Sequence, residues 1–236
     1  MRLHLLALLF LTATLPGLQA AEPHVLGIIG DSTVCEYPAE SPTRGWGHYI
    51  GEYFGPEVRV VNLAASGRST KTFIKEGRWT KMLAAKPEVV LIQFGHNDSH
   101  AKDKPEATDA ATDYRDYLRK YITETRAAGA KPVLVTPMMR RTFRPDGTLD
   151  DTLQPYADSM KTVANETNTP VIDLFTSSGE LYRKLGPEKC LELANSPADF
   201  THFSEKGARA MADLVMSQFA SAVPDWRPFL KTTQAK

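Results

Sequence analysis

Two short segments, far apart in the chain, carry the side chains with the clearest chemical potential. Ser32 ends the tripeptide Gly-Asp-Ser, and Asp199 and His202 lie three residues apart in the sequence DFTH. A serine hydroxyl becomes an effective nucleophile only when a base takes its proton and a third group orients that base. We therefore interpret Ser32 as a nucleophile, His202 as its base and Asp199 as the residue that orients the imidazole.

Acyl transfer from an ester also needs hydrogen-bond donors for the negative oxygen of the tetrahedral intermediate. The sequence offers three such donors, which are the main-chain N–H groups of Ser32 and Gly67 and the side-chain amide of Asn97. Glycine at position 67 lets the main chain approach a substrate without a Cβ atom in the way. Asn97 can donate without carrying a charge.

Each of these short motifs also has a purely structural interpretation. Gly-Asp-Ser can form a tight turn, and a glycine after a strand often reflects only main-chain geometry. The sequence GHND at 95–98 can begin a helix, and Asp199 can cap one while His202 lies on the surface. The functional interpretation is favoured because all four motifs occur in order, where the expected fold would bring them together.

The elements that must position these residues can be predicted from apolar runs and helical periodicity. Apolar runs predict strands at 25–30, 58–63, 89–94, 133–135 and 170–174. Helices are expected at 46–54, 108–128 and 205–219, and a hairpin or extended loop at 140–151.

Apolar strands that are separated by helices indicate a parallel sheet with both faces covered. We therefore expect one three-layer α/β/α sandwich with a central parallel sheet of about five strands, similar to flavodoxin. Ser32, Gly67 and Asn97 each lie just beyond the carboxyl end of a different predicted strand. Ligands bind at that edge of open parallel sheets, so three loops would deliver these groups to one rim.

The combination resembles the SGNH (GDSL) hydrolase superfamily, whose four motif blocks are matched by Ser32, Gly67, Asn97 and His202, with Asp199 in the fourth block. Longer segments look together like the rhamnogalacturonan acetylesterase group: GDST, GWGHYI, VVNLAASGRSTKTFIKEGRW, VVLIQFGHND, VLVTPMMRR and DFTHFSEKGA. They run from about residue 30 to residue 210. Thr33 departs from the leucine that is frequent in the first block of the wider superfamily.

The resemblance implies a serine esterase that removes acetyl groups from plant cell-wall polysaccharide or oligosaccharide, without metal or organic cofactor. His96 and Asp98 flank the expected oxyanion donor, where they could support the loop or contact sugar. Arg68, Arg140 and Arg141 could pair with uronate carboxylates or simply be solvated.

Alternative functions differ in substrate or in reaction. Within esterases, acetylated xylan or simple acyl chains remain open as substrates. A carbohydrate-binding relative without catalysis is disfavoured by the intact set of five residues. Phosphoryl transfer is poorly supported, because the sequence has no glycine-rich phosphate loop with lysine and no carboxylate cluster for two metals.

The N-terminal segment has the layout of a secretory signal peptide, with Arg2, an apolar stretch and small residues up to Ala20 and Ala21. The apolar stretch is too short to span about 30 Å of hydrocarbon. We therefore expect a signal peptide at 1–20, a hydrolase domain at 21–236, and secretion or residence in the periplasm.

Charge and cysteine content add weaker constraints. Basic and acidic residues number 28 each, so nothing suggests capture of nucleic acid or of an acidic membrane. Cys35 and Cys190 could form a disulfide or remain as two buried thiols. The sequence indicates no particular oligomeric state.

Overall fold

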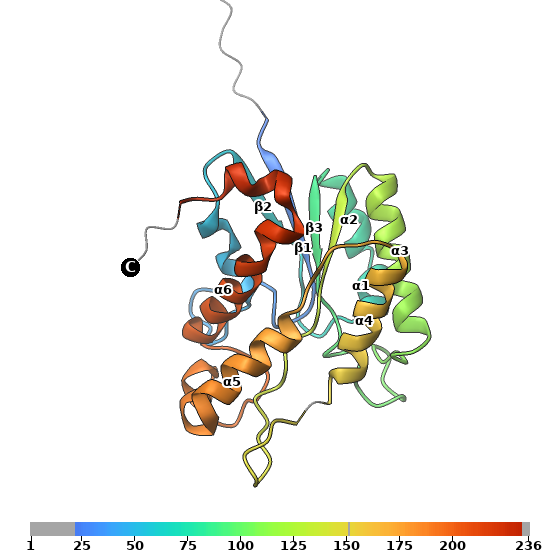
Figure 1. The fold of residues 1–236 in the computed structure, drawn as a ribbon. Coiled ribbons are helices and arrows are strands. Elements are labelled where there is room, and N and C mark those ends of the chain that lie inside the picture. The colour runs from blue at the N-terminus through green and yellow to red at the C-terminus, as the bar shows by residue number, and fades with distance from the viewer. Residues whose placement is uncertain (1–21, 151, 233–236) are drawn as a thin grey trace, which may run out of the picture.

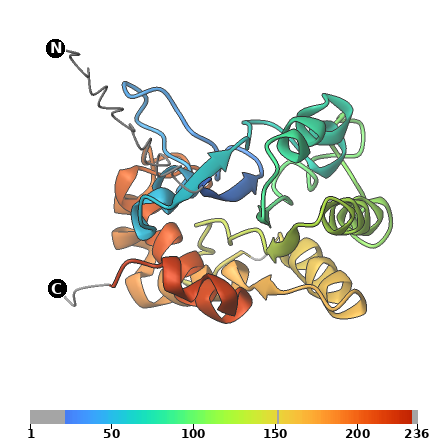
Figure 2. The same cartoon turned by 90° about the horizontal axis from the view of Figure 1, so that it is seen from above.

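A parallel sheet of five strands forms the centre of the protein (Figures 1 and 2). The computed structural model describes residues 22–150 and 152–232, so the expected signal peptide lies outside the described residues. The strands, in spatial order, are β2 (Val58–Asn62), β1 (His24–Ile29), β3 (Val89–Ile92), β4 (Lys131–Val135) and β5 (Val171–Ile172). All four pairings are parallel. The expected α/β/α fold is thereby confirmed.

Helices cover both faces of this sheet (Figure 2). One face packs against α1 (Thr70–Lys75), α2 (Arg78–Ala84), α3 (Asp113–Ala127) and α4 (Gln154–Glu166). The other packs against the 3₁₀ helices η1 (Trp46–Tyr53), η2 (Leu191–Leu193) and η3 (Pro224–Phe229), together with α5 (Leu174–Cys190) and α6 (Glu205–Ala222). No helix in these described parts is long and apolar enough to cross a membrane.

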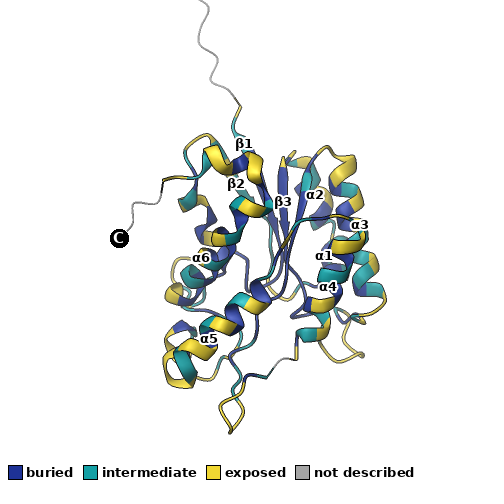
Figure 3. Cartoon of the chain, viewed as in Figure 1, coloured by how far each residue is buried: buried dark blue, intermediate teal, exposed yellow. Residues whose placement is uncertain are grey.

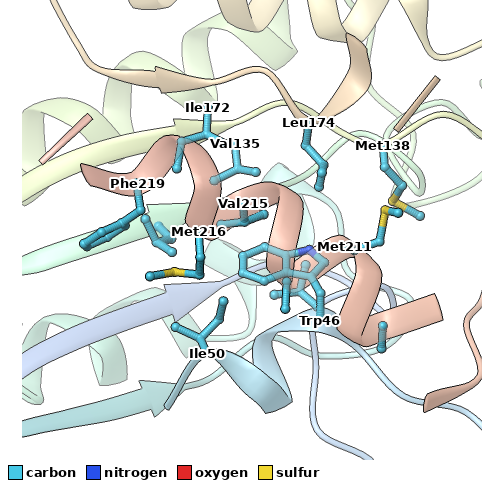
Figure 4. Close-up of a cluster of buried hydrophobic side chains, with 14 of the residues drawn as sticks. Trp46, Ile50, Val135, Met138, Ile172, Leu174, Met211, Val215, Met216 and Phe219 are labelled. Carbon is cyan, nitrogen blue, oxygen red and sulfur yellow. The ribbon is translucent and has the colours of Figure 1, made fainter. Parts of the chain in front are cut away.

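Alternation along the strands divides the core into two apolar clusters. Leu26 and Ile28 of β1 face the η1, α5 and α6 side, whereas Ile29 faces the α1 to α4 side. Figure 4 shows the first cluster, in which Trp46 and Ile50 of η1 lie close to Met211 and Val215 of α6. Figure 3 shows that the central strands β1, β3 and β4 are mostly buried, whereas the edge strands β2 and β5 carry partly exposed residues and most other exposed residues lie on the helices and loops. Strands that are buried on both faces explain why the sequence shows continuous apolar runs.

Two predicted helices differ from expectation, one in its type and the other in the residue at which it begins. The segment at 46–54 forms a 3₁₀ helix rather than an α-helix, with the N–H groups of Trp46 and Gly47 donating to the carbonyls of Thr33 and Val34. The helix expected from residue 108 begins instead at Asp113, because the main-chain N–H of Thr108 donates to the carbonyl of Asp98 at 2.9 Å. In both cases the backbone is engaged by loops at the candidate site.

The loops after β4 and after α5 project beyond the carboxyl edge of the sheet (Figure 1). The expected hairpin is present, with an antiparallel bridge between Phe143 and Leu149 and Gly147 in its turn at φ 82°. Helix α5 is interrupted at Gly186, which has a non-helical φ of 75° and precedes Pro187. Its last residues therefore change direction and approach the base of the hairpin at the rim of the sheet.

Candidate active site

Ser32, His202 and Asp199 are joined in series by hydrogen bonds. Nε2 of His202 lies 2.9 Å from Oγ of Ser32, and Nδ1 of the same ring lies 2.8 Å from Oδ2 of Asp199. Ser32 follows β1, whereas the other two residues lie in the loop before α6. One ring nitrogen therefore faces the hydroxyl while the carboxylate fixes the other, which is the geometry needed for proton transfer from serine.

The loop that carries Asp199 and His202 is shaped by the carboxylate itself. Oδ1 of Asp199 accepts the main-chain N–H groups of Thr201 and His202, both at 2.8 Å. Burial opposes ionisation, but these two donors and the imidazole outweigh it and lower the pKa of Asp199. The carboxylate therefore stays ionised and holds the imidazole in one orientation.

Arg141, which follows β4, holds the same loop from behind. Its guanidinium donates to the carbonyls of His202 at 2.6 Å and Asp199 at 3.2 Å, and its main-chain N–H donates to the carbonyl of Phe200 at 2.8 Å. The side chain is only 3% exposed and lies over the ring of Phe203, 4.7 Å from its centroid. Arg141 is therefore placed to support the loop that carries Asp199 and His202.

The turn that carries Ser32 is fixed by a buried chain of polar side chains. Trp46 donates to Oε1 of Gln93 at 2.8 Å, and Gln93 donates to Oγ1 of Thr33 at 2.7 Å. Thr33 in turn donates from its hydroxyl and its main-chain N–H to Oδ1 of Asp31. These bonds explain why threonine suits position 33, because leucine could neither donate to Asp31 nor accept from Gln93.

Two further groups at this turn could not be identified from sequence. The hydroxyl of Tyr37 donates to the carbonyl of Ser32 at 2.8 Å. Main-chain groups of η1 bind the segment just after the nucleophile, as described above. The candidate nucleophile is thus held by Gln93 just after β3, by η1 and by Tyr37 in the following loop.

His96 lies beneath the Ser32 turn. Its side chain is 3% exposed, and Nδ1 lies 3.5 Å from Oδ2 of the fully buried Asp31. Burial lowers the pKa of His96 despite the nearby carboxylate, while His96 and Thr33 lower the pKa of Asp31. His96 and Asp31 therefore lie side by side beneath the turn, and the burial of His96 favours support of the loop over contact with sugar.

The three expected oxyanion donors lie on loops at the same edge of the sheet. In the described parts of the chain, the main-chain N–H groups of Ser32 and Gly67 make no hydrogen bond to a protein acceptor. Gly67 has a φ of 79°, which side chains with a Cβ rarely adopt. The amide of Asn97 donates one hydrogen to the carbonyl of Arg68 at 3.0 Å and keeps a second one available.

Asp98 ties the Asn97 loop to the start of α1. Its fully buried carboxyl accepts bonds from the hydroxyl and main-chain N–H of Thr70 and from the hydroxyl of Thr108 at 3.0 Å. Burial raises the pKa of Asp98 to about 7, although these donors oppose the shift. The Gly67 and Asn97 segments are consequently held together by Asp98 as well as by the bond from Asn97 to Arg68.

Arg68 and Arg140, the other two arginines considered as sugar contacts, lie in different surroundings. Arg68 pairs with Glu76 at 2.9 Å and donates to the carbonyl of Ser66. Arg140 donates to Oγ1 of Thr201 at 2.6 Å and lines a cavity of about 400 Å³ together with His202. Arg140 is therefore next to the reacting groups, whereas Arg68 is engaged at the rim.

The described residues include no group of three or more histidine, cysteine or acidic side chains that could hold a metal ion. Cys35 and Cys190 are both buried free thiols, which answers the question that the sequence left open. Burial raises the pKa of each thiol, that of Cys35 to about 11.

The α/β/α fold and the hydrogen-bonded series of Ser32, His202 and Asp199 are those expected of an ester hydrolase. The chain belongs to the GDSL-like lipase/acylhydrolase family, whose model matches residues 28–210. It is therefore a carboxylic ester hydrolase.

Three related proteins are similar to this chain over most of its length. Rhamnogalacturonan acetylesterase RhgT of Bacillus subtilis is 39% identical over 209 residues, covering 82% of this chain and 88% of RhgT. The crystal structure of YxiM from the same species superposes with a TM-score of 0.76 at 29% identity, covering 86% of this chain and 58% of YxiM. Axe2, an acetylxylan esterase from Geobacillus stearothermophilus, shares the fold with a TM-score of 0.65 at 24% identity, covering 86% of this chain and 94% of Axe2.

Proposed function

We propose that the protein is an exported serine acetylesterase that removes O-acetyl groups from plant cell-wall polysaccharide, with rhamnogalacturonan as its substrate. The observation that carries the chemistry is the pair of hydrogen bonds on the His202 ring, 2.9 Å to Ser32 and 2.8 Å to Asp199. The 39% identity to RhgT supports the choice of substrate.

In the proposed reaction, Oγ of Ser32 attacks the acetyl carbonyl while Nε2 of His202 takes the hydroxyl proton. The negative oxygen of the tetrahedral intermediate accepts hydrogen bonds from the N–H groups of Ser32 and Gly67 and from the Asn97 amide. His202 then donates its proton to the sugar oxygen, which leaves as a hydroxyl. The acetyl group remains on Ser32.

The second half of the reaction repeats these steps with water. His202 takes a proton from water, which attacks the acetyl-serine carbonyl and forms a second tetrahedral intermediate at the same donors. Collapse returns the proton to Ser32 and releases acetate. Asp199 stays ionised throughout and stabilises the imidazolium.

Arg140 is the proposed sugar contact nearest to the reacting groups. It lines the cavity that also contains His202, and its guanidinium is partly buried without a carboxylate partner in the described residues. A uronate carboxylate could pair with it there. Arg68 is less suited to this role because it already pairs with Glu76. His96 is less suited because its side chain is buried.

The decisive experiment measures acetate release from acetylated rhamnogalacturonan, acetylated xylan and a long-chain ester under the same conditions. We expect the highest kcat/KM with rhamnogalacturonan. Preference for xylan would move the assignment to the acetylxylan esterases, and preference for the long-chain ester would overturn the polysaccharide assignment altogether.

Export depends on residues 1–20, which we propose are a signal peptide that is removed. The experiment is to express the full chain, separate the cells from the medium and the periplasm, and sequence the N-terminus of the exported protein. A mature protein beginning near residue 21 is expected. A chain that stays in the cytoplasm with Met1 or Arg2 at its N-terminus would contradict the proposal.

A further inference from the structure

A second cavity, of about 280 Å³, lies beside the candidate triad. Three segments that are distant in sequence form its walls: Phe143 at the base of the hairpin, residues 187–191 at the end of α5, and Asp199 with Phe200. Figure 1 shows the hairpin beyond the carboxyl edge of the sheet, on the side where α5 ends. The break at Gly186 brings the α5 wall into place. We call this space the hairpin cavity.

The surface of the hairpin cavity is mostly carbon and is open to solvent. The described residues include three exposed large apolar side chains, namely Leu191 (49%), Phe200 (46%) and Val171 (37%). Two of these, Leu191 and Phe200, line the hairpin cavity. Exposed apolar side chains that gather at one hollow are typical of a binding site.

The hairpin cavity adjoins the candidate active site on one particular side. It shares Asp199 and Phe200 with the larger cavity that contains Arg140 and His202. His202 gives its proton to the leaving oxygen, so the alcohol part of the ester must lie on the His202 side of the nucleophile. Both cavities therefore lie on the side of the leaving group, which for an acetylated polysaccharide is the sugar chain.

We infer that the hairpin cavity binds a neutral sugar ring of the polysaccharide, one that neighbours the acetylated residue, with the ring stacked on Phe200. The inference rests on the proposed function, because it assumes a sugar chain as the leaving group. The apolar faces of a sugar ring pack on aromatic and aliphatic side chains such as Phe200, Phe143 and Leu191. The carboxylate of Glu188 at the same cavity can accept hydrogen bonds from sugar hydroxyls.

Charge determines which sugar fits. Two acids, Glu188 and Asp199, line the hairpin cavity with one cation, Arg141, whose Nη2 donates to two main-chain carbonyls and whose buried Nη1 has no hydrogen-bond partner among the described residues. A hydroxyl of a neutral ring can accept from Nη1, whereas a uronate ring would also bring its carboxylate toward Glu188. The hairpin cavity thus selects chains in which an uncharged sugar adjoins an acetylated uronate, as in rhamnogalacturonan, over chains made of uronates alone.

A fatty acyl chain is the competing occupant, and the position of the hairpin cavity argues against it. An acyl group is attached to Oγ of Ser32 during the reaction, yet Ser32, Gly67 and Asn97 do not line this space. Its volume of about 280 Å³ lies just below the range of about 300–1,000 Å³ for small-molecule sites. It can hold one ring but not an extended chain that begins at the nucleophile.

The test compares wild type with Phe200→Ala and Leu191→Ala on three substrates: acetylated rhamnogalacturonan oligosaccharides, acetylated homogalacturonan oligosaccharides and p-nitrophenyl acetate. Each variant should lose about tenfold in kcat/KM on the rhamnogalacturonan oligosaccharides relative to p-nitrophenyl acetate, mostly through KM. Tenfold corresponds to about 1.4 kcal/mol. Leu191 lies outside the loop that carries Asp199 and His202, so its variant keeps the test valid if Phe200→Ala disturbs that loop.

Two further variants sharpen the comparison. Val171→Ala removes the third exposed apolar side chain, which lines neither cavity, and should leave the substrate ratio unchanged. Glu188→Gln removes the negative charge and should raise kcat/KM on homogalacturonan severalfold relative to rhamnogalacturonan. Circular dichroism and thermal unfolding establish that each variant is folded.

The outcomes separate this inference from the proposed function. If wild type hydrolyses p-nitrophenyl acetate but releases no acetate from either oligosaccharide, the proposed function fails. If wild type acts on rhamnogalacturonan but Phe200→Ala and Leu191→Ala keep its substrate ratio, the sugar site is wrong. A selective loss on p-nitrophenyl octanoate would instead identify the hairpin cavity as an acyl site and overturn the inference.

Discussion

The guanidinium of Arg141 donates to the main-chain carbonyl of His202 at 2.6 Å, so a buried residue after β4 holds the loop that carries the proposed catalytic base. The same side chain reaches the carbonyl of Asp199 at 3.2 Å. The position of the imidazole relative to Ser32 therefore depends on a residue that touches none of the reacting atoms.

We expect Arg141→Ala to lower kcat on p-nitrophenyl acetate about 10²-fold, since small misplacement of a catalytic group has effects of that order. KM should change little. Guanidinium ions added to the folded variant should restore part of kcat, which loss of general stability would not allow. Arg119→Ala, which breaks exposed ion pairs on α3, is the control. An unchanged kcat in Arg141→Ala, or a lowered kcat that guanidinium does not restore, would show that Arg141 has no positioning role.

Ser32→Ala and His202→Ala should each abolish hydrolysis of p-nitrophenyl acetate, because they remove the nucleophile and the base. Neither side chain belongs to the apolar clusters, so the variants should fold normally. Steady-state kinetics and circular dichroism check both statements. Activity near that of wild type in either folded variant would refute the assignment.

Asp199→Asn should slow the reaction by a factor on the order of 10⁴ without abolishing it. The amide would no longer hold the imidazole in the tautomer that accepts the serine proton, but the oxyanion donors would remain. Measurement requires enough enzyme to resolve the residual rate from wild-type contamination. A loss of less than tenfold would mean that Asp199 does not orient His202.

Asn97→Ala should reduce kcat by about 10²–10³, equivalent to about 2.7–4 kcal/mol of transition-state stabilisation. The effect should fall on kcat more than on KM, because the donor acts on the negative oxygen and only weakly on the ester carbonyl. The comparison is made on p-nitrophenyl acetate and on the polysaccharide. Equal losses in binding and turnover would argue that the loop, and not the donor, is affected.

Asp98→Asn should flatten the pH dependence of stability. Because the pKa of Asp98 in the fold is raised to about 7, its contribution is fully present below its unfolded pKa and is lost as the pH rises through about 7. Between pH 4.5 and 7 the wild type should lose up to about 1.4 kcal/mol per pH unit from this group. Urea unfolding at both pH values tests this, with the exposed Asp103→Asn as control. Equal pH dependence in wild type and Asp98→Asn would contradict it.

The sheet could be predicted from sequence because its strands are buried on both faces and appear as continuous apolar runs. Residues 25–30 and 89–94 are clear examples, and their confirmed positions locate the loops that follow. The 3₁₀ form of η1 could not be predicted, since it depends on main-chain bonds to residues 33 and 34. Periodicity along one segment carries no information about such partners.

Some residues of the candidate site could be predicted from the sequence and others could not, for a related reason. Ser32, Gly67, Asn97, Asp199 and His202 lie in recognisable motifs, so they could be named from the sequence. Gln93, Tyr37 and the role of Arg141 could not, because an isolated glutamine, tyrosine or arginine is compatible with many environments. Their functions arise from contacts between segments that only the folded chain brings together.

The hydrogen bond between Ser32 and His202 joins residues separated by 170 positions, with four of the five strands lying between them. During synthesis the nucleophile therefore emerges from the ribosome long before the base that activates it. Hydrolytic competence arises late, only once the segment before α6 has docked onto the sheet. A partly made or partly folded chain would consequently lack the proposed base beside Ser32.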